Sequence, residues 1–139
     1  MLQGEYRHTI DAKGRFFFPA PLKEDIGDNP TICRGLGKSL WVFSEMDWKA
    51  FTDKIASLPY ADSRKMRYFY VARSQSASVD AQGRVVIPQY MREHAELQKN
   101  IVIIGALDRV EIWDEQNWDK ETGGVTSDEI MEIMERYDF

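Results

Sequence analysis

The chain has 139 residues, of which 43% are hydrophobic and 29% are charged, as is usual for globular proteins. No run of eighteen apolar residues occurs, and the first residues do not resemble a secretory signal, so no membrane partner is expected. Cys33 is the single cysteine, which excludes an internal disulfide and fits a reducing cytoplasm.

The formal net charge of −5 argues mildly against a nucleic-acid partner, but the charge is unevenly distributed. Residues 1–74 carry 12 basic and 9 acidic side chains, whereas residues 75–139 carry 6 and 14. Residues 108–138 alone hold 11 acidic and 3 basic side chains. Because binding depends on the local distribution of charge, the total does not exclude a basic face elsewhere.

The first half predicts a strand over residues 5–10, the turn DAKG and a strand over residues 15–18. Asp at the first and Gly at the fourth turn position are typical of a type I turn that returns the chain as a hairpin. Pro19 ends the strand and suits the first position of a short helix. The next predicted elements are a helix over residues 20–26 closed by Gly27, strands over 31–34 and 40–43, and a helix capped by Ser44 with Trp48, Phe51, Ile55 and Leu58 on one face.

A helical segment over residues 63–73 is predicted to bridge to a second half with the same order of elements. That half has strand SASV, turn DAQG, strand RVVIP with Pro88, a helix over residues 89–97 followed by Asn100, and strands over 101–104 and 110–113. Thr126 and Glu129 have the spacing of a capping box for a last helix. The apolar stripe of this helix consists of Ile130, Ile133, Met134 and Tyr137.

The two halves are a duplication. IDAKGRFFFPAPLK at residues 10–23 recurs as VDAQGRVVIPQYMR at residues 79–92, and LWVFSEMDW later in the first half matches VEIWDEQNW. Two copies are too few for a solenoid. We therefore expect one compact domain over residues 1–139, made of repeats at about 5–52 and 75–120 that are related by a pseudo-two-fold axis.

The duplicated D-A-x-G-R motif, the Pro four residues after each Arg and the repeat spacing resemble the MraZ family of bacterial proteins, in the SpoVT/AbrB-like superfamily. The resemblance covers nearly the whole chain. It implies an α+β fold with a swapped-hairpin, AbrB-like β-barrel built by both halves, with helices at its periphery. It also implies ring-like homo-oligomers larger than a dimer, and a nucleoid-associated regulator of the division and cell-wall gene cluster.

The family's two Asp-x-x-x-Arg motifs are matched by Asp11 with Arg15 and by Asp80 with Arg84. Each Arg is a candidate contact to promoter DNA, because its planar fork of donors suits a phosphate or a guanine edge. An ion pair that only stiffens the turn is the alternative, and both roles are compatible if Asp orients Arg. Lys13 at the tip of the first turn is a third DNA-binding candidate.

The turn itself is expected to depend on four residues that do not contact DNA, namely Asp11, Gly14, Asp80 and Gly83. The basic run within residues 64–73 and the acidic tail are interpreted as solvated helix faces. Trp48 and Trp118, at equivalent repeat positions, are expected to serve core or subunit packing rather than base stacking.

An enzyme is not expected, because the sequence lacks the common catalytic and phosphate-binding motifs. His8 and His94 lack ligand patterns, Cys33 is interpreted as a buried inert thiol, and no metal, cofactor or small-molecule substrate is expected. Two other functions remain open. One is an AbrB-type antitoxin that binds DNA and a toxin, and the other is a structural ring protein that binds no nucleic acid.

Overall fold

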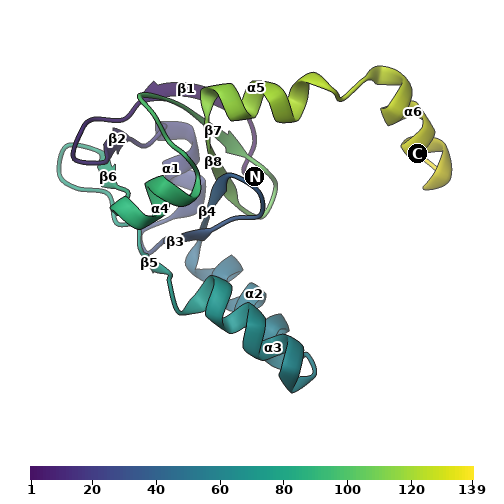
Figure 1. Cartoon of the computed structure of the whole chain (residues 1–139), viewed down its shortest axis with the longest axis horizontal. Coiled ribbons are helices and arrows are strands. Elements are labelled where there is room, and N and C mark those ends of the chain that lie inside the picture. Colours follow the sequence, from purple (N-terminus) through teal and green to yellow (C-terminus); the bar gives the residue numbers. More distant parts are fainter.

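Eight strands form two sheets in the computed structural model, which describes residues 1–139 (Figure 1). The larger sheet has the order β1-β7-β8-β4-β3-β5, and every pairing in it is antiparallel. Its strands are β1 (Glu5–Thr9), β3 (Thr31–Arg34), β4 (Ser39–Phe43), β5 (Gln75–Ser76), β7 (Asn100–Gly105) and β8 (Val110–Asp114). The smaller sheet is an antiparallel ribbon of β2 (Arg15–Phe17) and β6 (Arg84–Val86).

The strands pair across the two halves of the chain. β1 pairs with β7, β4 with β8, and β2 with β6. Exchanging the repeats, so that β1 replaces β5, β3 replaces β7 and β4 replaces β8, leaves the order of the large sheet unchanged. A two-fold relation between the halves produces such an order. The α+β class is therefore confirmed, while the swapped-hairpin barrel stays a prediction that this pairing supports.

Six α-helices and one π-helical turn surround the sheets. They are α1 (Ala20–Ile26), α2 (Glu45–Ser57), α3 (Tyr60–Met66), η1 (Arg67–Val71), α4 (Gln89–His94), α5 (Glu115–Gly123) and α6 (Ser127–Arg136). Figure 1 shows α1 and α4 near the β2–β6 ribbon, α2 and α3 projecting from one end of the molecule, and α5 leading to α6 on another side. No helix is both long enough and apolar enough to cross a lipid bilayer.

The helix ends confirm two predicted caps. The Ser44 side chain accepts a hydrogen bond from the Asp47 amide, and Thr126 accepts one from Glu129. Leu58 lies just outside α2 as its C-cap rather than on the helix face.

Other predicted boundaries were wrong. Pro19 and Pro88 are N-cap residues, one position before the helices that they introduce. α4 ends at His94 instead of continuing to residue 97, because Glu96 takes a positive φ of 53°. Asn100, which follows this helix in the sequence, begins β7. Of the predicted strand SASV (residues 76–79), only Ser76 lies in a strand, as the second residue of β5.

The bridging segment starts earlier than predicted, at Tyr60 after Pro59, and widens into the π-helical turn η1 over its second half. Tyr70 on η1 is buried against Trp41, with ring centroids 5.5 Å apart. These two rings belong to a small second core together with Cys33, Phe43 and Ile55. Cys33 is buried, as predicted, and burial raises the pKa of its thiol to about 12, which favours an unreactive thiol.

The principal core contains 18 buried residues drawn from both halves of the chain. Phe16 of β2 and Val85 of β6 enter it from the ribbon, and Leu22 of α1 and Met91 of α4 enter it from the short helices. Each of these side chains is at most 1% exposed. Because the ribbon's inner side is anchored in this core, its outer side has a fixed orientation toward solvent.

Candidate nucleic-acid interface

The two turns have the same construction. Gly14 donates its N–H to the Asp11 carbonyl at 3.0 Å and has a φ of 82°, and Gly83 does the same toward Asp80 at 3.0 Å with a φ of 83°. This φ lies in the left-handed region that favours glycine. The chain reverses in both turns, but the prediction of a paired hairpin at each turn was wrong. β1 pairs with β7 and β5 with β3 in the large sheet, whereas β2 and β6 pair with each other in the ribbon.

In each turn, the aspartate side chain accepts hydrogen bonds from backbone amides of the turn itself. Oδ1 of Asp11 accepts hydrogen bonds from the amides of Lys13 and Arg15, at 3.0 and 2.9 Å. In the same way, Oδ1 of Asp80 accepts hydrogen bonds from the amides of Gln82 and Arg84, at 2.9 and 2.8 Å. The amide of the fourth residue is the largest cause that lowers the pKa of each carboxyl below its ordinary value of 3.8. Both aspartates are therefore held in the charged form.

The second carboxylate oxygen holds the arginine. Arg15 Nε lies 2.7 Å from Asp11 Oδ2, and Arg84 Nε lies 3.1 Å from Asp80 Oδ2. Both pairs use only Nε, and the terminal Nη atoms of both guanidinium groups have no partner within the chain. The aspartate thus orients each arginine and leaves two nitrogen donors available for a ligand.

The ribbon brings the two arginines onto one face. Arg15 lies opposite Val86 and Phe17 lies opposite Arg84, and residues opposite each other in an antiparallel pair share a face. Phe17 is 57% exposed and Val86 is 54% exposed, so the arginines flank two solvent-facing apolar side chains. We call these four residues the ribbon face.

Phe17 and Val86 were missed by the sequence interpretation. The period-2 alternation of a strand would have placed both on the same side as the arginines, because each lies two residues after its arginine. The runs RFFF and RVVI are apolar on both sides, however, so the pattern alone did not distinguish a buried from an exposed position.

Each turn is hydrogen-bonded to the residue that directly follows the ribbon strand of the other half. The Gly14 carbonyl accepts a hydrogen bond from Ile87 at 2.7 Å, and the Gly83 carbonyl accepts one from Phe18 at 3.1 Å. The first turn is the more crowded, since a Cβ on Gly14 would lie 2.5 Å from the Ile87 carbonyl oxygen. A Cβ on Gly83 would meet no atom closer than 4.0 Å.

Arg92 is a third residue that the sequence interpretation missed. From α4 in the second half, it donates to the Ile87 carbonyl at 3.1 Å and to the Ala12 carbonyl at 3.4 Å. Arg92 therefore connects the first turn to the chain that follows β6, through these two carbonyl groups. Its repeat counterpart is Lys23, and this match of basic residues was visible in the sequence. The two carbonyls that it reaches depend on the tertiary fold and were not visible.

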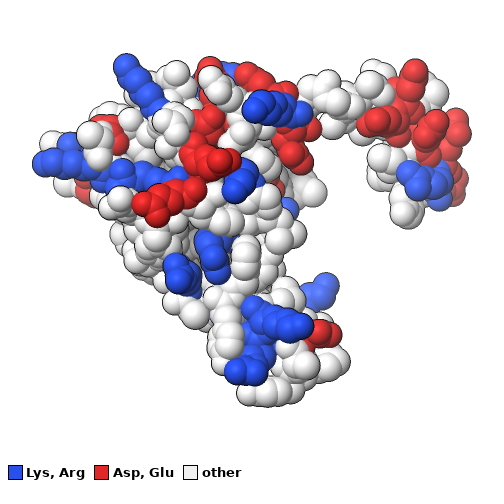
Figure 2. Space-filling view, viewed as in Figure 1, with Lys and Arg blue, Asp and Glu red and all other residues white.

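Basic side chains gather at the end of the molecule that carries the two turns, with some acidic side chains beside them (Figure 2). Lys13 at the tip of the first turn is exposed and has no ion-pair partner in the chain. The corresponding tip residue of the second turn is Gln82. The two turns thus share a backbone conformation and differ in charge.

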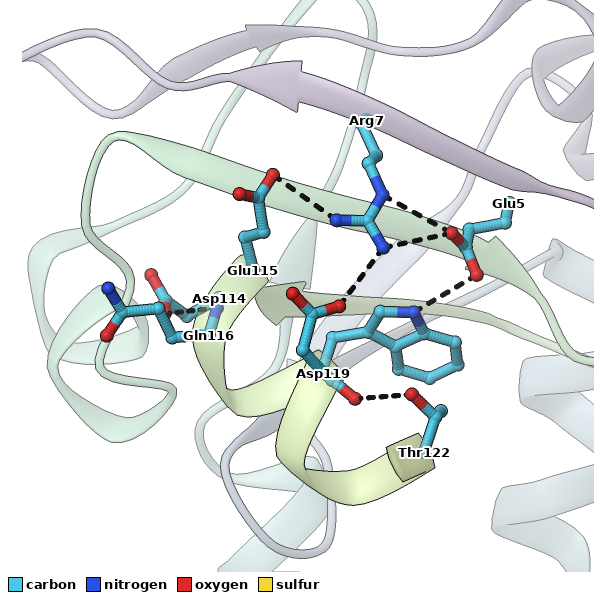
Figure 3. A network of polar contacts seen from close by, with 8 residues as sticks. Glu5, Arg7, Asp114, Glu115, Gln116, Asp119 and Thr122 are labelled. Carbon is cyan, nitrogen blue, oxygen red and sulfur yellow. Dashed lines mark hydrogen bonds and ion pairs between the residues drawn. The ribbon is translucent and has the colours of Figure 1, made fainter. Parts of the chain in front are cut away.

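Another arginine, Arg7 on β1, is fully engaged in a separate network (Figure 3). Its guanidinium lies 3.2 Å from Glu5, 3.4 Å from Glu115 and 3.1 Å from Asp119. The hydrogen bond to Asp119 is the largest cause that raises the pKa of Arg7. Trp118 donates its indole N–H to Glu5 at 3.1 Å. This network attaches α5 to β1 and leaves Arg7 no free donor edge for DNA.

Comparison with known proteins places the chain in a family. The family model described as "MraZ protein, putative antitoxin-like" matches residues 1–68 and again residues 71–137, one match for each half. The Transcriptional regulator MraZ of Heliobacterium modesticaldum is 40% identical, and that of Caldanaerobacter subterraneus is 38% identical, each over 99% of both chains. The same-named protein of Carboxydothermus hydrogenoformans is 40% identical over 96% of both chains. The chain therefore belongs to the MraZ family.

Proposed function

We propose that this protein is a transcriptional regulator that binds double-stranded promoter DNA through its ribbon face. The observation that carries the proposal is the pair of guanidinium groups on one ribbon, each oriented by an aspartate that leaves both Nη atoms free. The major groove of B-DNA admits a two-stranded β-ribbon. The name of its relatives, Transcriptional regulator MraZ, supports the same function.

The side chains of the ribbon face are proposed to contact different chemical groups of the DNA. Arg15 and Arg84 donate to guanine edges or phosphates, and Phe17 and Val86 offer apolar contact to thymine methyl groups. Lys13 adds a phosphate contact beside the first turn. The aspartates and glycines of the two turns, Asp11, Gly14, Asp80 and Gly83, hold this arrangement without touching DNA, because a carboxylate repels phosphate.

A single ribbon face is a small interface, and non-specific DNA binding by one such module is typically about 10⁻⁴ to 10⁻⁶ M at physiological salt. We therefore propose a homo-oligomer, larger than a dimer, that engages repeated boxes in one promoter. Once one subunit is bound, the next contact is intramolecular, and avidity can increase affinity by about 10² to 10⁴. The proposed target is the promoter of the division and cell-wall gene cluster, which implies association with the nucleoid.

The proposal is tested by titrating the protein onto DNA from upstream of its own gene, with a shuffled fragment of equal length and composition as the control. We expect tighter binding to the promoter fragment, protection of evenly spaced boxes in a footprint, and affinity that falls as salt rises. Equal affinity for both fragments would remove sequence-specific regulation. No binding to either fragment would leave a structural ring protein as the better description.

A further inference from the structure

The last helix, α6, presents an apolar stripe that nothing in the chain covers. Ile130, Ile133 and Met134 are 43%, 40% and 43% exposed, and Tyr137 is 69% exposed. The spacing of these residues places them on one side of the helix. No residue of α6 is buried. A ten-residue helix with this stripe gains most of its stability from packing against another surface.

A groove of matching character lies elsewhere on the molecule, between the β3–β4 loop and the segment formed by α3 and η1. Its volume is about 450 Å³, and its lining is Leu36, Lys65, Met66, Phe69 and Tyr70. Leu36 is 61% exposed at its edge. Arg34 stacks over the Phe69 ring at 4.2 Å and donates to the Phe69 carbonyl at 3.1 Å, so this wall of the groove is held in place.

The stripe and the groove are surrounded by opposite charge. Residues 127–138 contain five acidic side chains and one basic side chain, whereas residues 60–73 contain four basic side chains and one acidic side chain. In Figure 2 acidic atoms cover much of the separate lobe that Figure 1 identifies as α6, and basic atoms cover the end occupied by α3. Such complementarity favours and orients an association between the two elements.

The groove that α6 fits is on another chain. Figure 1 shows α6 and α3 at different ends of the molecule. Only residues 124–126 connect α5 to α6, a span of at most about 14 Å even when fully extended. The Arg7 network holds α5 on β1, so α6 stays near that end.

We propose that α6 of one copy of this chain docks in the groove between the β3–β4 loop and α3–η1 of a second copy. The contact joins two different surfaces, so each chain offers one of each, and repetition gives a closed ring or an open filament. The inference deepens the proposed function by naming the contact behind the proposed assembly. It does not depend on DNA binding.

The test uses two variants that each damage one side of the contact. Ile133→Glu places a charge in the stripe, and Leu36→Glu places one at the edge of the groove. Both positions are exposed in the single chain, so both variants are expected to fold normally. Met46→Glu is the matched control, because Met46 is 81% exposed on α2 and lies outside the groove.

Light scattering at a concentration where the parent is assembled measures the mass of each variant. We expect Ile133→Glu and Leu36→Glu each to have a lower mass than the parent, and Met46→Glu to equal it. An equimolar mixture of the first two should have a higher mass than either alone, because the intact stripe of one fits the intact groove of the other. Such pairing gives a dimer of twice the 16.2 kDa chain mass where no other contact contributes.

Several outcomes would overturn the inference. They are a parent protein of 16.2 kDa, an Ile133→Glu protein with the parent mass, and a mixture no heavier than its components. Stable capture of a different protein by α6, with the parent chain monomeric, would also overturn it. The proposed function fails in another way, since an assembly of parent mass that binds no promoter DNA contradicts the ribbon face but not the α6 contact.

Discussion

Replacing Arg15 by Ala separates the two roles that its position allows. The turn keeps its backbone bonds to Asp11 and its left-handed Gly14, because neither depends on the arginine side chain. The ion pair of Arg15 with Asp11 lies at the surface, where such pairs contribute little. We therefore expect a loss of only about 0.5 kcal/mol in the free energy of unfolding.

The expected loss in DNA affinity is much larger. A bidentate arginine contact to a base contributes about 1–3 kcal/mol, which corresponds to roughly 5- to 150-fold in affinity. In an assembly that engages several boxes, each bound subunit repeats the loss. Arg84→Ala is expected to act in the same direction, because its Nε is held by Asp80 and its Nη atoms are also free.

Titrations at several salt concentrations identify the kind of contact. Loss of one phosphate contact reduces the slope of log affinity against log salt by about 0.9, whereas loss of a base contact leaves the slope and reduces the preference for promoter over shuffled DNA. Lys49→Ala is the matched control, since Lys49 forms an exposed pair with Asp53 at 2.6 Å, four residues along α2 and outside the ribbon face.

Two results would refute this reasoning. If Arg15→Ala unfolds at a much lower temperature than Lys49→Ala, the arginine serves mainly to hold the turn. If Arg15→Ala and Arg84→Ala both fold normally and bind the promoter like the parent, the DNA-binding surface lies elsewhere on the molecule.

Four further variants probe the turns. Gly14→Ala and Gly83→Ala both force a side chain into the left-handed region, at roughly 1–2 kcal/mol, and we expect Gly14→Ala to lower the melting temperature further because its Cβ meets a backbone oxygen at 2.5 Å. The pKa values of Asp11 and Asp80 are lowered in the folded protein, so their contribution to stability is present above pH 3.8 and is lost as the pH falls below this value. A variant with Asn at both positions should therefore lose stability less steeply with falling pH in acid unfolding. Arg92→Ala is expected to cost about 1 kcal/mol and to weaken DNA binding through the first turn, and parental values in both assays would contradict its supporting role.

Local signals in the sequence were sufficient for most of the elements. The strand over residues 31–34 and the helix over residues 20–26 have the predicted bounds, because β-branched residues and flanking Pro and Gly mark their ends. The caps at Ser44 and Thr126 were also predictable, since a cap depends on residues within one helical turn. The duplication could be read directly from the repeated motif.

The pairing partners could not be predicted from local signals. The three-residue strands β2 and β6 pair across 69 residues of sequence, and nothing within either strand specifies the other. For this reason the ribbon face, with Phe17 and Val86 between the arginines, was not identified. Arg92 was missed for the same reason, because the carbonyl of Ala12 that it contacts is 80 residues away.

The tip residues Lys13 and Gln82 give the two halves of the ribbon face different charge. Exchanging these two residues transfers the additional positive charge from the first half to the second. The backbone of the two turns is nearly the same, with φ of 82° at Gly14 and 83° at Gly83, so exchanging the tips changes charge and not geometry. In the parent we expect Arg15→Ala to weaken promoter binding more than Arg84→Ala, because Lys13 strengthens the first half's hold on phosphate. With Lys13→Gln and Gln82→Lys combined, net charge is unchanged and the order of the two arginine variants should reverse in DNA titrations at fixed salt. If the order stays as in the parent, the inequality arises from another difference between the halves, such as the support that Arg92 gives to the first turn alone.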